Sequence, residues 1–138
     1  MSENARRPTP PPPPVRTVGG TTVVALYGEI DLATAPPLAA RLDALASAPY
    51  PDLVLDLRPV SFIDCTGLGV LCRTRKRVRA RQGRLRLIAG GRHFLRVLRA
   101  VRLDGVFEIH PELPPELDRP ITRPITGPGC AEQRKNVA

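Results

Sequence analysis

The chain has 138 residues, 42% of them apolar and 4% aromatic, which is enough for one domain with an aliphatic core. No apolar run approaches the roughly 20 residues of a membrane-spanning helix, and the first residues lack the apolar stretch of a secretory signal. The three cysteines and two histidines form no paired or metal-ligating pattern. We therefore expect a cytoplasmic protein without a membrane segment, a metal or a cofactor.

The formal net charge is +8, and the excess of basic residues is local. Twelve of the 21 basic residues lie between Arg73 and Arg102, a stretch without any acidic residue. Such a patch suits nucleic acid, an acidic protein or an anionic membrane surface. No aromatic residue is interleaved among the bases of 73–81, and no recognition-helix motif is present. The bases of 73–81 therefore have three interpretations, which are an ordinary solvated helix face, a surface for a protein partner and a nucleic-acid-binding surface. We rank nucleic acid below a protein partner, and we expect no membrane partner.

Prolines mark both ends of the chain. Six of the 17 prolines lie in residues 8–14 and six more in residues 111–128. The first cluster predicts an extended, polyproline-like tail over residues 1–14. The second predicts a proline-rich extension over residues 111–138, with at most a short helix near residues 115–118. Residues 15–110 are expected to form one compact domain.

Hydrophobic patterns within this domain alternate between strand and helix. Gly19 and Gly20 predict a hairpin between the first two strands, and Thr34 is a candidate N-cap for the first helix. The order implies a largely parallel sheet covered by helices. In chain order, the expected strands cover residues 15–18, 22–27, 53–57, 84–89 and 107–109, and the expected helices cover 35–47, 66–82 and a segment marked by Phe94, Val97, Leu98 and Val101.

The most informative stretch is Val60–Val70, which follows a buried strand and opens a helix. Small residues at such a turn leave backbone N–H groups exposed at the positive end of the helix, where an anion or a phosphoryl group is favoured. The alternative is that Asp64 or Thr66 simply caps the helix, and spacing alone favours this capping role over anion binding. The Gly67-x-Gly69 pair is too short for a dinucleotide fingerprint, and no P-loop sequence follows it.

The segment from Asp64 to Gly69 resembles the signature of the STAS domain of bacterial anti-sigma-factor antagonists, which is roughly Asp-Ser-Ser/Thr-Gly-Leu-Gly. Residues 28–35 resemble the Gly-Glu-Leu/Ile-Asp loop of that family, and residues 94–98 with 103–109 resemble its late helix and final strand. The three motifs occur in the family order over residues 15–110. The resemblance implies an α/β STAS fold, with a mixed sheet of four to five strands and helices packed mainly on one face.

The resemblance also implies a mechanism. Members of this family bind an anti-sigma factor that is also a serine/threonine kinase, and this binding releases a sigma factor. The partner binds ATP and phosphorylates the antagonist at the helix start, and the added charge disrupts the interface. The protein itself is then not an enzyme and has no catalytic residues. The implied switch residues are Asp64, Cys65, Thr66 and Gly67, and the implied partner-binding residues are Asp31, Thr34, Leu68, Gly69, Arg73 and Arg77.

One departure from the family pattern is Cys65, which occupies the position of the phosphorylated serine. We rank first a protein that binds its partner but escapes phosphorylation, then phosphorylation of Thr66, and then a redox-sensitive Cys65. A small residue without a signalling role is at least as plausible as the redox function. Asp31 similarly has two interpretations, as a loop-capping carboxylate or as a contact to the kinase.

Two other functions stay open from the sequence. Loss of the acceptor serine is compatible with a STAS scaffold or sensor module in another signalling complex. The basic stretch is compatible with a nucleic-acid-associated protein, which we rank lower. A second departure is at the C-terminus, where Pro111, Pro114 and Pro115 interrupt the region in which family members usually form a final helix.

Overall fold

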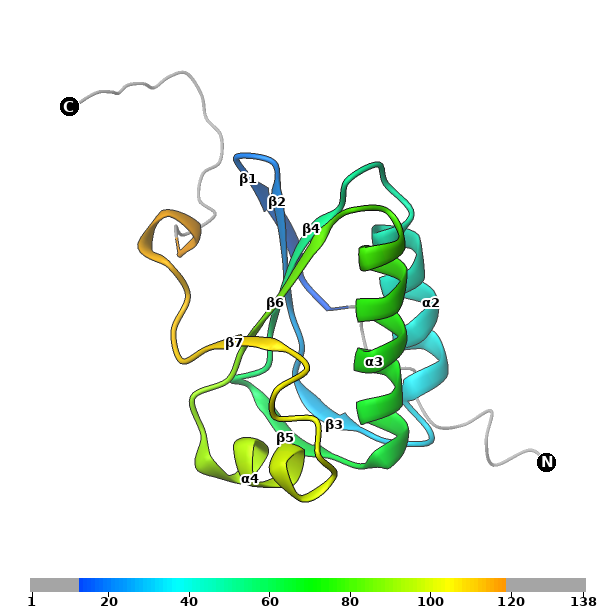
Figure 1. Ribbon diagram of the computed structural model, residues 1–138, viewed down its shortest axis with the longest axis vertical. Coiled ribbons are helices and arrows are strands. Elements are labelled where there is room, and N and C mark those ends of the chain that lie inside the picture. The colour runs from blue at the N-terminus through cyan, green and yellow to red at the C-terminus, as the bar shows by residue number, and fades with distance from the viewer. Residues whose placement is uncertain (1–12, 119–138) are drawn as a thin grey trace.

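The computed structural model describes residues 13–118, and these residues form a five-stranded mixed sheet with three α-helices. β1 is antiparallel to β2, whereas every other pair of neighbours in this sheet is parallel (Figure 1). The order across the sheet is β1-β2-β4-β6-β7. The strands are β1 (Val15–Val18), β2 (Thr21–Ala25), β4 (Asp52–Asp56), β6 (Arg84–Ile88) and β7 (Glu108–His110).

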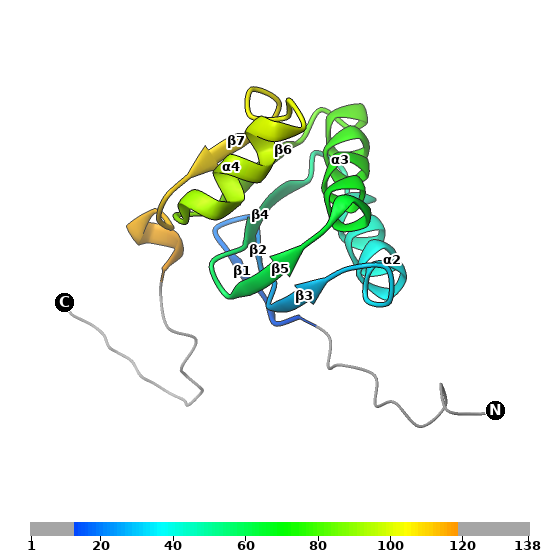
Figure 2. The same cartoon turned by 90° about the horizontal axis from the view of Figure 1, so that it is seen from below.

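Helices α2 (Ala35–Ala46) and α3 (Cys65–Ala80) lie side by side on one face of the sheet (Figures 1 and 2). Helix α4 (Arg92–Ala100) lies at the end of the sheet where the parallel strands terminate. Its buried Leu98 belongs to the same apolar core as Leu42 of α2 and Leu71 of α3. The expected mixed α/β fold with helices mainly on one face is thus confirmed.

A second, two-stranded parallel sheet is formed by β3 (Gly28–Ile30) and β5 (Val60–Ile63) at the same end of the molecule. The sequence patterns predict loops at both segments, and this prediction is wrong. Strands of three and four residues are too short to show the alternation that identifies a strand, and their pairing joins segments far apart in the chain. Gly28 has φ of 74° at the start of β3, where the chain leaves the main sheet.

Alternate residues of the central strands serve the two faces of the sheet. Leu53 and Leu55 of β4 and Leu87 of β6 face the helices, whereas Val54 and Ile88 face the opposite side. Both sets are fully buried, which explains why the sequences of these strands are nearly continuous apolar runs.

The C-terminal segment covers part of the face opposite the helices. The expected short helix is the 3-10 turn η1 (Pro115–Leu117), which lies across the sheet from α2 and α3 (Figure 1). Leu113 and Leu117 pack there against Val23, Val54 and Ile88. A guanidinium nitrogen of Arg16 on β1 donates a hydrogen bond to the Leu117 carbonyl. Between residues 111 and 118, the proline-interrupted region therefore packs as a 3-10 turn and not as an α-helix.

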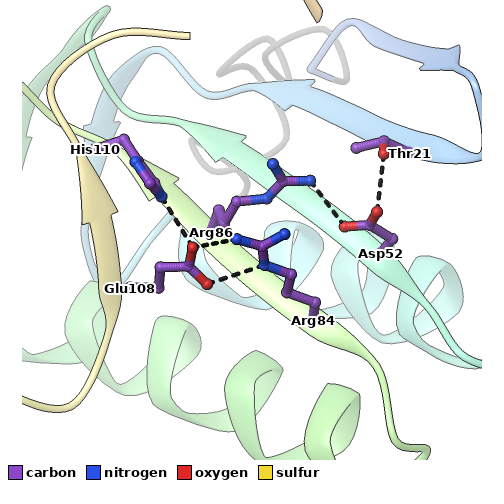
Figure 3. Close-up of polar contacts among 6 residues, drawn as sticks. All are labelled: Thr21, Asp52, Arg84, Arg86, Glu108 and His110. Atoms are coloured by element: carbon purple, nitrogen blue, oxygen red, sulfur yellow. Dashed lines mark hydrogen bonds and ion pairs between the residues drawn. The ribbon is translucent and has the colours of Figure 1, made fainter. Parts of the chain in front are cut away.

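The rest of that face carries a network of charged side chains (Figure 3). Arg86, which is mostly buried, donates to Asp52 across 3.1 Å, and the Thr21 hydroxyl donates to the same carboxylate across 2.8 Å. On the neighbouring strand pair, Arg84 Nε donates to Glu108 across 3.0 Å, and His110 contacts Glu108 at 2.9 Å. The alternation of Arg and Leu in β6 thus places arginines on one face and leucines in the core.

Some element boundaries differ from those predicted. Helix α3 begins at Cys65 and ends at Ala80, two residues before the expected end. The last strand begins at Glu108, one residue after its expected start at Phe107, which is a core residue. Of the predicted N-terminal tail, only Pro13 and Pro14 are among the described residues. Residues 119–138 of the predicted C-terminal extension, which include Cys130, lie outside the described residues.

Glu108 makes stability depend on pH in the acidic range. The hydrogen bond from Arg84, with a further contribution from His110, lowers the Glu108 pKa from an ordinary value of 4.5 to about 2. A lowered carboxyl pKa adds stability above the unfolded-state value and loses it as pH falls toward about 2. We predict that Glu108→Gln flattens the decline in the free energy of unfolding between pH 5 and 2.5, measured by urea denaturation.

Glu116→Gln is the matched control, because Glu116 is an exposed carboxylate that makes no ion pair among residues 13–118. The control should show the same decline as the parent protein. An unchanged decline in Glu108→Gln would show that this carboxylate contributes nothing to acid stability.

Candidate functional site

Two loops at the carboxyl ends of the parallel strands form the candidate site. One connects β3 to α2 and contains Asp31 and Thr34, and the other is the junction between β5 and α3 at Asp64 (Figures 1 and 2). Binding sites in open α/β sheets commonly lie at this edge, because the connecting loops gather there. The fold therefore brings together two segments that the sequence motifs singled out separately.

The start of α3 is a capped helix terminus. Asp64 is the N-cap, with an extended backbone, and its carboxylate accepts a hydrogen bond from the Gly67 amide across 3.0 Å. The capping role predicted for Asp64 is confirmed, whereas Thr66 lies inside the helix. Cys65 and Thr66 are the first two helical residues, and both are exposed. Their side chains are accessible at the positive end of the helix.

The β3–α2 loop is held by its own side chains. The Asp31 carboxylate accepts hydrogen bonds from the amides of Ala33, at 3.0 Å, and Thr34, at 3.1 Å. The Thr34 hydroxyl donates to the Glu29 carbonyl at 2.8 Å and accepts from the Asp31 amide at 2.9 Å. Thr34 occupies the N-cap position of α2, but its side chain does not cap the helix, because its hydroxyl is used by this loop.

The two loops are joined directly. The Asp64 amide donates a hydrogen bond to the Ile30 carbonyl across 3.2 Å. Gly67 on α3 lies so close to β3 and β5 that a Cβ atom at this position would be 2.7 Å from the Ile30 carbonyl oxygen and 2.6 Å from Ile63 Cγ1. The absence of a side chain at position 67 therefore allows α3 to begin against both short strands.

Two exposed apolar side chains belong to these segments, and the sequence motifs do not identify them. Leu32 in the β3–α2 loop is 74% exposed, and Phe62 on β5 is 48% exposed. Their only sequence signal is a large apolar residue inside or beside a polar motif. Exposed apolar residues near a polar site are typical of protein interaction surfaces.

Leu68 and Gly69 differ in accessibility. Leu68 is only 5% exposed and belongs to the apolar core. Its side chain is therefore not accessible to a partner, in contrast to the partner-binding role that the family resemblance implies. The helical period explains this, because position 68 faces the sheet while position 69 faces solvent. Gly69 is exposed, with open space where a side chain would lie.

Arg73 and Arg77 reach a carboxylate on the neighbouring helix. Arg73 Nη2 lies 2.9 Å and Arg77 Nε lies 3.0 Å from Asp43 of α2. The hydrogen bond from Arg73, aided by the charges of Arg73 and Arg77, lowers the Asp43 pKa below its usual value, although partial burial opposes this shift. Both arginines stay about half exposed, but part of the basic charge of α3 serves to join α3 to α2.

The described residues offer little other chemistry at this site. Residues 13–118 contain no group of three or more His, Cys, Asp or Glu side chains that could hold a metal ion. None of their helices is both long and apolar enough to cross a membrane. Cys72 is half-buried and packs against the core, two helical turns beyond the exposed Cys65.

Gly67 and Gly69 provide a matched test of the junction between the loops. Gly67→Ala should lower the free energy of unfolding by about 1–3 kcal/mol, because the new methyl group overlaps backbone and side-chain atoms. Gly69→Ala should leave stability unchanged or raise it by up to about 1 kcal/mol, since alanine favours a helix and the space is open. Urea denaturation of both variants measures this difference, and equal effects would contradict the close approach of α3 to β3.

Comparison with known proteins agrees with this architecture. The STAS domain family matches residues 12–114. The chain is 36% identical over 86 residues to an anti-sigma-B factor antagonist of Bacillus subtilis, which covers 62% of this chain and 78% of that protein. A second antagonist of that name, from Listeria monocytogenes, is 35% identical over 86 residues, covering 62% of this chain and 75% of its own length.

A crystal structure of an anti-sigma factor antagonist from Mycobacterium paratuberculosis superimposes with a TM-score of 0.67 and 33% sequence identity, covering 76% of this chain and 89% of that one. The family range of residues 12–114 takes in the five-stranded sheet, both short strands and the capped start of α3. The chain therefore belongs to the STAS domain family.

Proposed function

We propose that this protein is a cytoplasmic anti-sigma-factor antagonist. It binds an anti-sigma factor that is also a serine/threonine kinase, and this binding releases a sigma factor. The names of its relatives support the antagonist function. The observation that carries the proposal for this chain is the hydrogen bond from the Asp64 amide to the Ile30 carbonyl. This bond holds the segments of two family motifs next to each other, so that one partner can contact both.

The proposed contact surface consists of the β3–α2 loop, β5 and the first turn of α3. Asp31 and Thr34 fix the shape of the loop, while Leu32 and Phe62 supply exposed apolar area. The exposed residues of the first turn of α3 are small, so a partner can approach them closely. A few apolar anchors surrounded by polar groups are the usual composition of a protein interface.

The N-terminus of α3 is also the proposed place of control. A phosphoryl group on the first helical turn would gain from the helix dipole, but it would add negative charge beside Asp31 and Asp64. The partner supplies the kinase activity and the ATP, so this protein needs neither a nucleotide site nor a catalytic residue. Because a thiol is not a substrate for serine phosphorylation, we propose that Cys65 keeps the protein in its binding-competent form.

Binding to the anti-sigma factor tests this proposal. The full chain, immobilised and exposed to a lysate of the source organism, should retain an anti-sigma factor with an ATP-binding kinase domain. Leu32→Ala should weaken binding of the purified partner by about 1 kcal/mol or more, because it removes an exposed apolar anchor. Titration calorimetry with purified proteins measures the affinity.

Tyr50→Ala is the matched control for Leu32→Ala. Both side chains are 74% exposed, but the loop before β4 lies at the opposite end of the sheet from β3 (Figure 1). The control should bind with the parent affinity. Failure to retain any anti-sigma factor would overturn the proposal and leave a STAS module that serves another signalling complex.

Cys65→Ser should convert the protein into a phosphate acceptor. With the cognate kinase and ATP, we expect one phosphoryl group on the Cys65→Ser variant by intact-mass analysis and none on the parent protein. The serine hydroxyl would replace an exposed thiol at the first position of α3, with the Asp64 cap unchanged.

Cys65→Ala controls for the loss of the thiol and should stay unmodified. Phosphate on the parent protein that is lost in Thr66→Ala would instead establish Thr66 as the acceptor. In that case the proposal of an unphosphorylated, permanently competent antagonist would be wrong.

A further inference from the structure

A groove of about 850 Å³ lies beside the candidate site. It is lined by β3 with the residues before it, by one side of α2 and by Pro13. Most of the lining is apolar, and Tyr27 contributes an aromatic ring that is 38% exposed. Its volume lies within the range of about 300–1,000 Å³ that is common for ligand sites.

The N-terminal part of the chain leads into this groove. Val15 pairs with Val24 in the antiparallel ladder, and the Pro14 carbonyl accepts a hydrogen bond from the Ala25 amide across 3.0 Å. Each step back along the chain therefore moves one residue further toward Tyr27. Pro13, the next residue, already lines the groove. Proline has no N–H, so Pro13 and Pro14 cannot donate hydrogen bonds to the ladder between β1 and β2.

The five residues that precede Pro13 are Pro8–Pro12, four of which are proline. We propose that the groove is a polyproline-binding site and that its occupant is this segment of the same chain. In a polyproline II conformation five residues span about 15 Å without internal hydrogen bonds, and such segments bind apolar and aromatic surfaces at a low entropic cost.

Two further features favour this occupant over a separate peptide. The segment is attached directly to Pro13, which gives it a high effective concentration at the groove. Arg41 of α2 also lines the groove, and its guanidinium can donate hydrogen bonds to the carbonyl groups that a polyproline II segment leaves exposed. The proposal concerns contacts within this chain alone and does not depend on the proposed function.

Tyrosine fluorescence provides a direct test. The chain has two tyrosines and no tryptophan, so Tyr50→Phe leaves Tyr27 as the only emitter. In this background, Pro10, Pro11 and Pro12 are all changed to glycine in the full chain, and quenching by acrylamide is measured. We expect a loss of protection, seen as a larger quenching constant for Tyr27, because glycine removes both the apolar rings and the pre-formed extended conformation.

Changing Pro120, Pro124 and Pro128 to glycine in the same background is the matched control and should leave quenching unchanged. A synthetic peptide of residues 1–12, added to the variant with glycine at positions 10–12, should restore the protection of Tyr27. Thermal unfolding confirms that the variants are folded. Equal quenching in the parent and the variant, or an equal rise in the variant and the control, would overturn the proposal.

Discussion

The close packing of α3 against β3 and β5 at Gly67 is the constraint on which the site depends. A parallel pair of three- and four-residue strands has too few hydrogen bonds to be stable in isolation. Here the first turn of α3 lies over the pair, and the Asp64 amide bonds to the Ile30 carbonyl. A side chain at position 67 would separate the helix from β3 and with it the Asp31 loop from Cys65. The absence of a Cβ atom at Gly67 thus sets the relative position of the two loops of the candidate site.

The parts of the fold that could be predicted from the sequence are those encoded by local patterns. The alternation of apolar strands with helical periodicity predicts the mixed α/β sheet, and a helix-start rule predicts the Asp64 cap. The pairing of β3 with β5 was missed because it depends on contacts between distant segments. The ion pairs of Asp43 with Arg73 and Arg77 were missed for the same reason, since residues 30 or more positions apart meet only when α2 lies beside α3.

The two faces of the sheet are covered by different kinds of side chain. On the helical face, leucine and valine side chains meet two long helices, and hydrophobic burial dominates. On the other face, within residues 13–118, Leu113 and Leu117 of the C-terminal segment supply the apolar cover. The remaining area is filled by arginines of β6, which are tolerated there because Asp52 and Glu108 lie on the adjacent strands. Within the described residues, these ion pairs and the two leucines together cover the face that α2 and α3 leave open.

In the proposed mechanism, a thiol in place of a hydroxyl at position 65 separates partner recognition from control by phosphate. The geometry that a partner would recognise is set by the Asp64 cap, the Asp31 loop and Gly67, and none of these involves the side chain of Cys65. The capacity to be switched off by phosphate at that position requires the hydroxyl alone. The groove between β3 and α2 adjoins the proposed contact surface, because Thr34 and Ser61 line the groove and also belong to the segments of that surface.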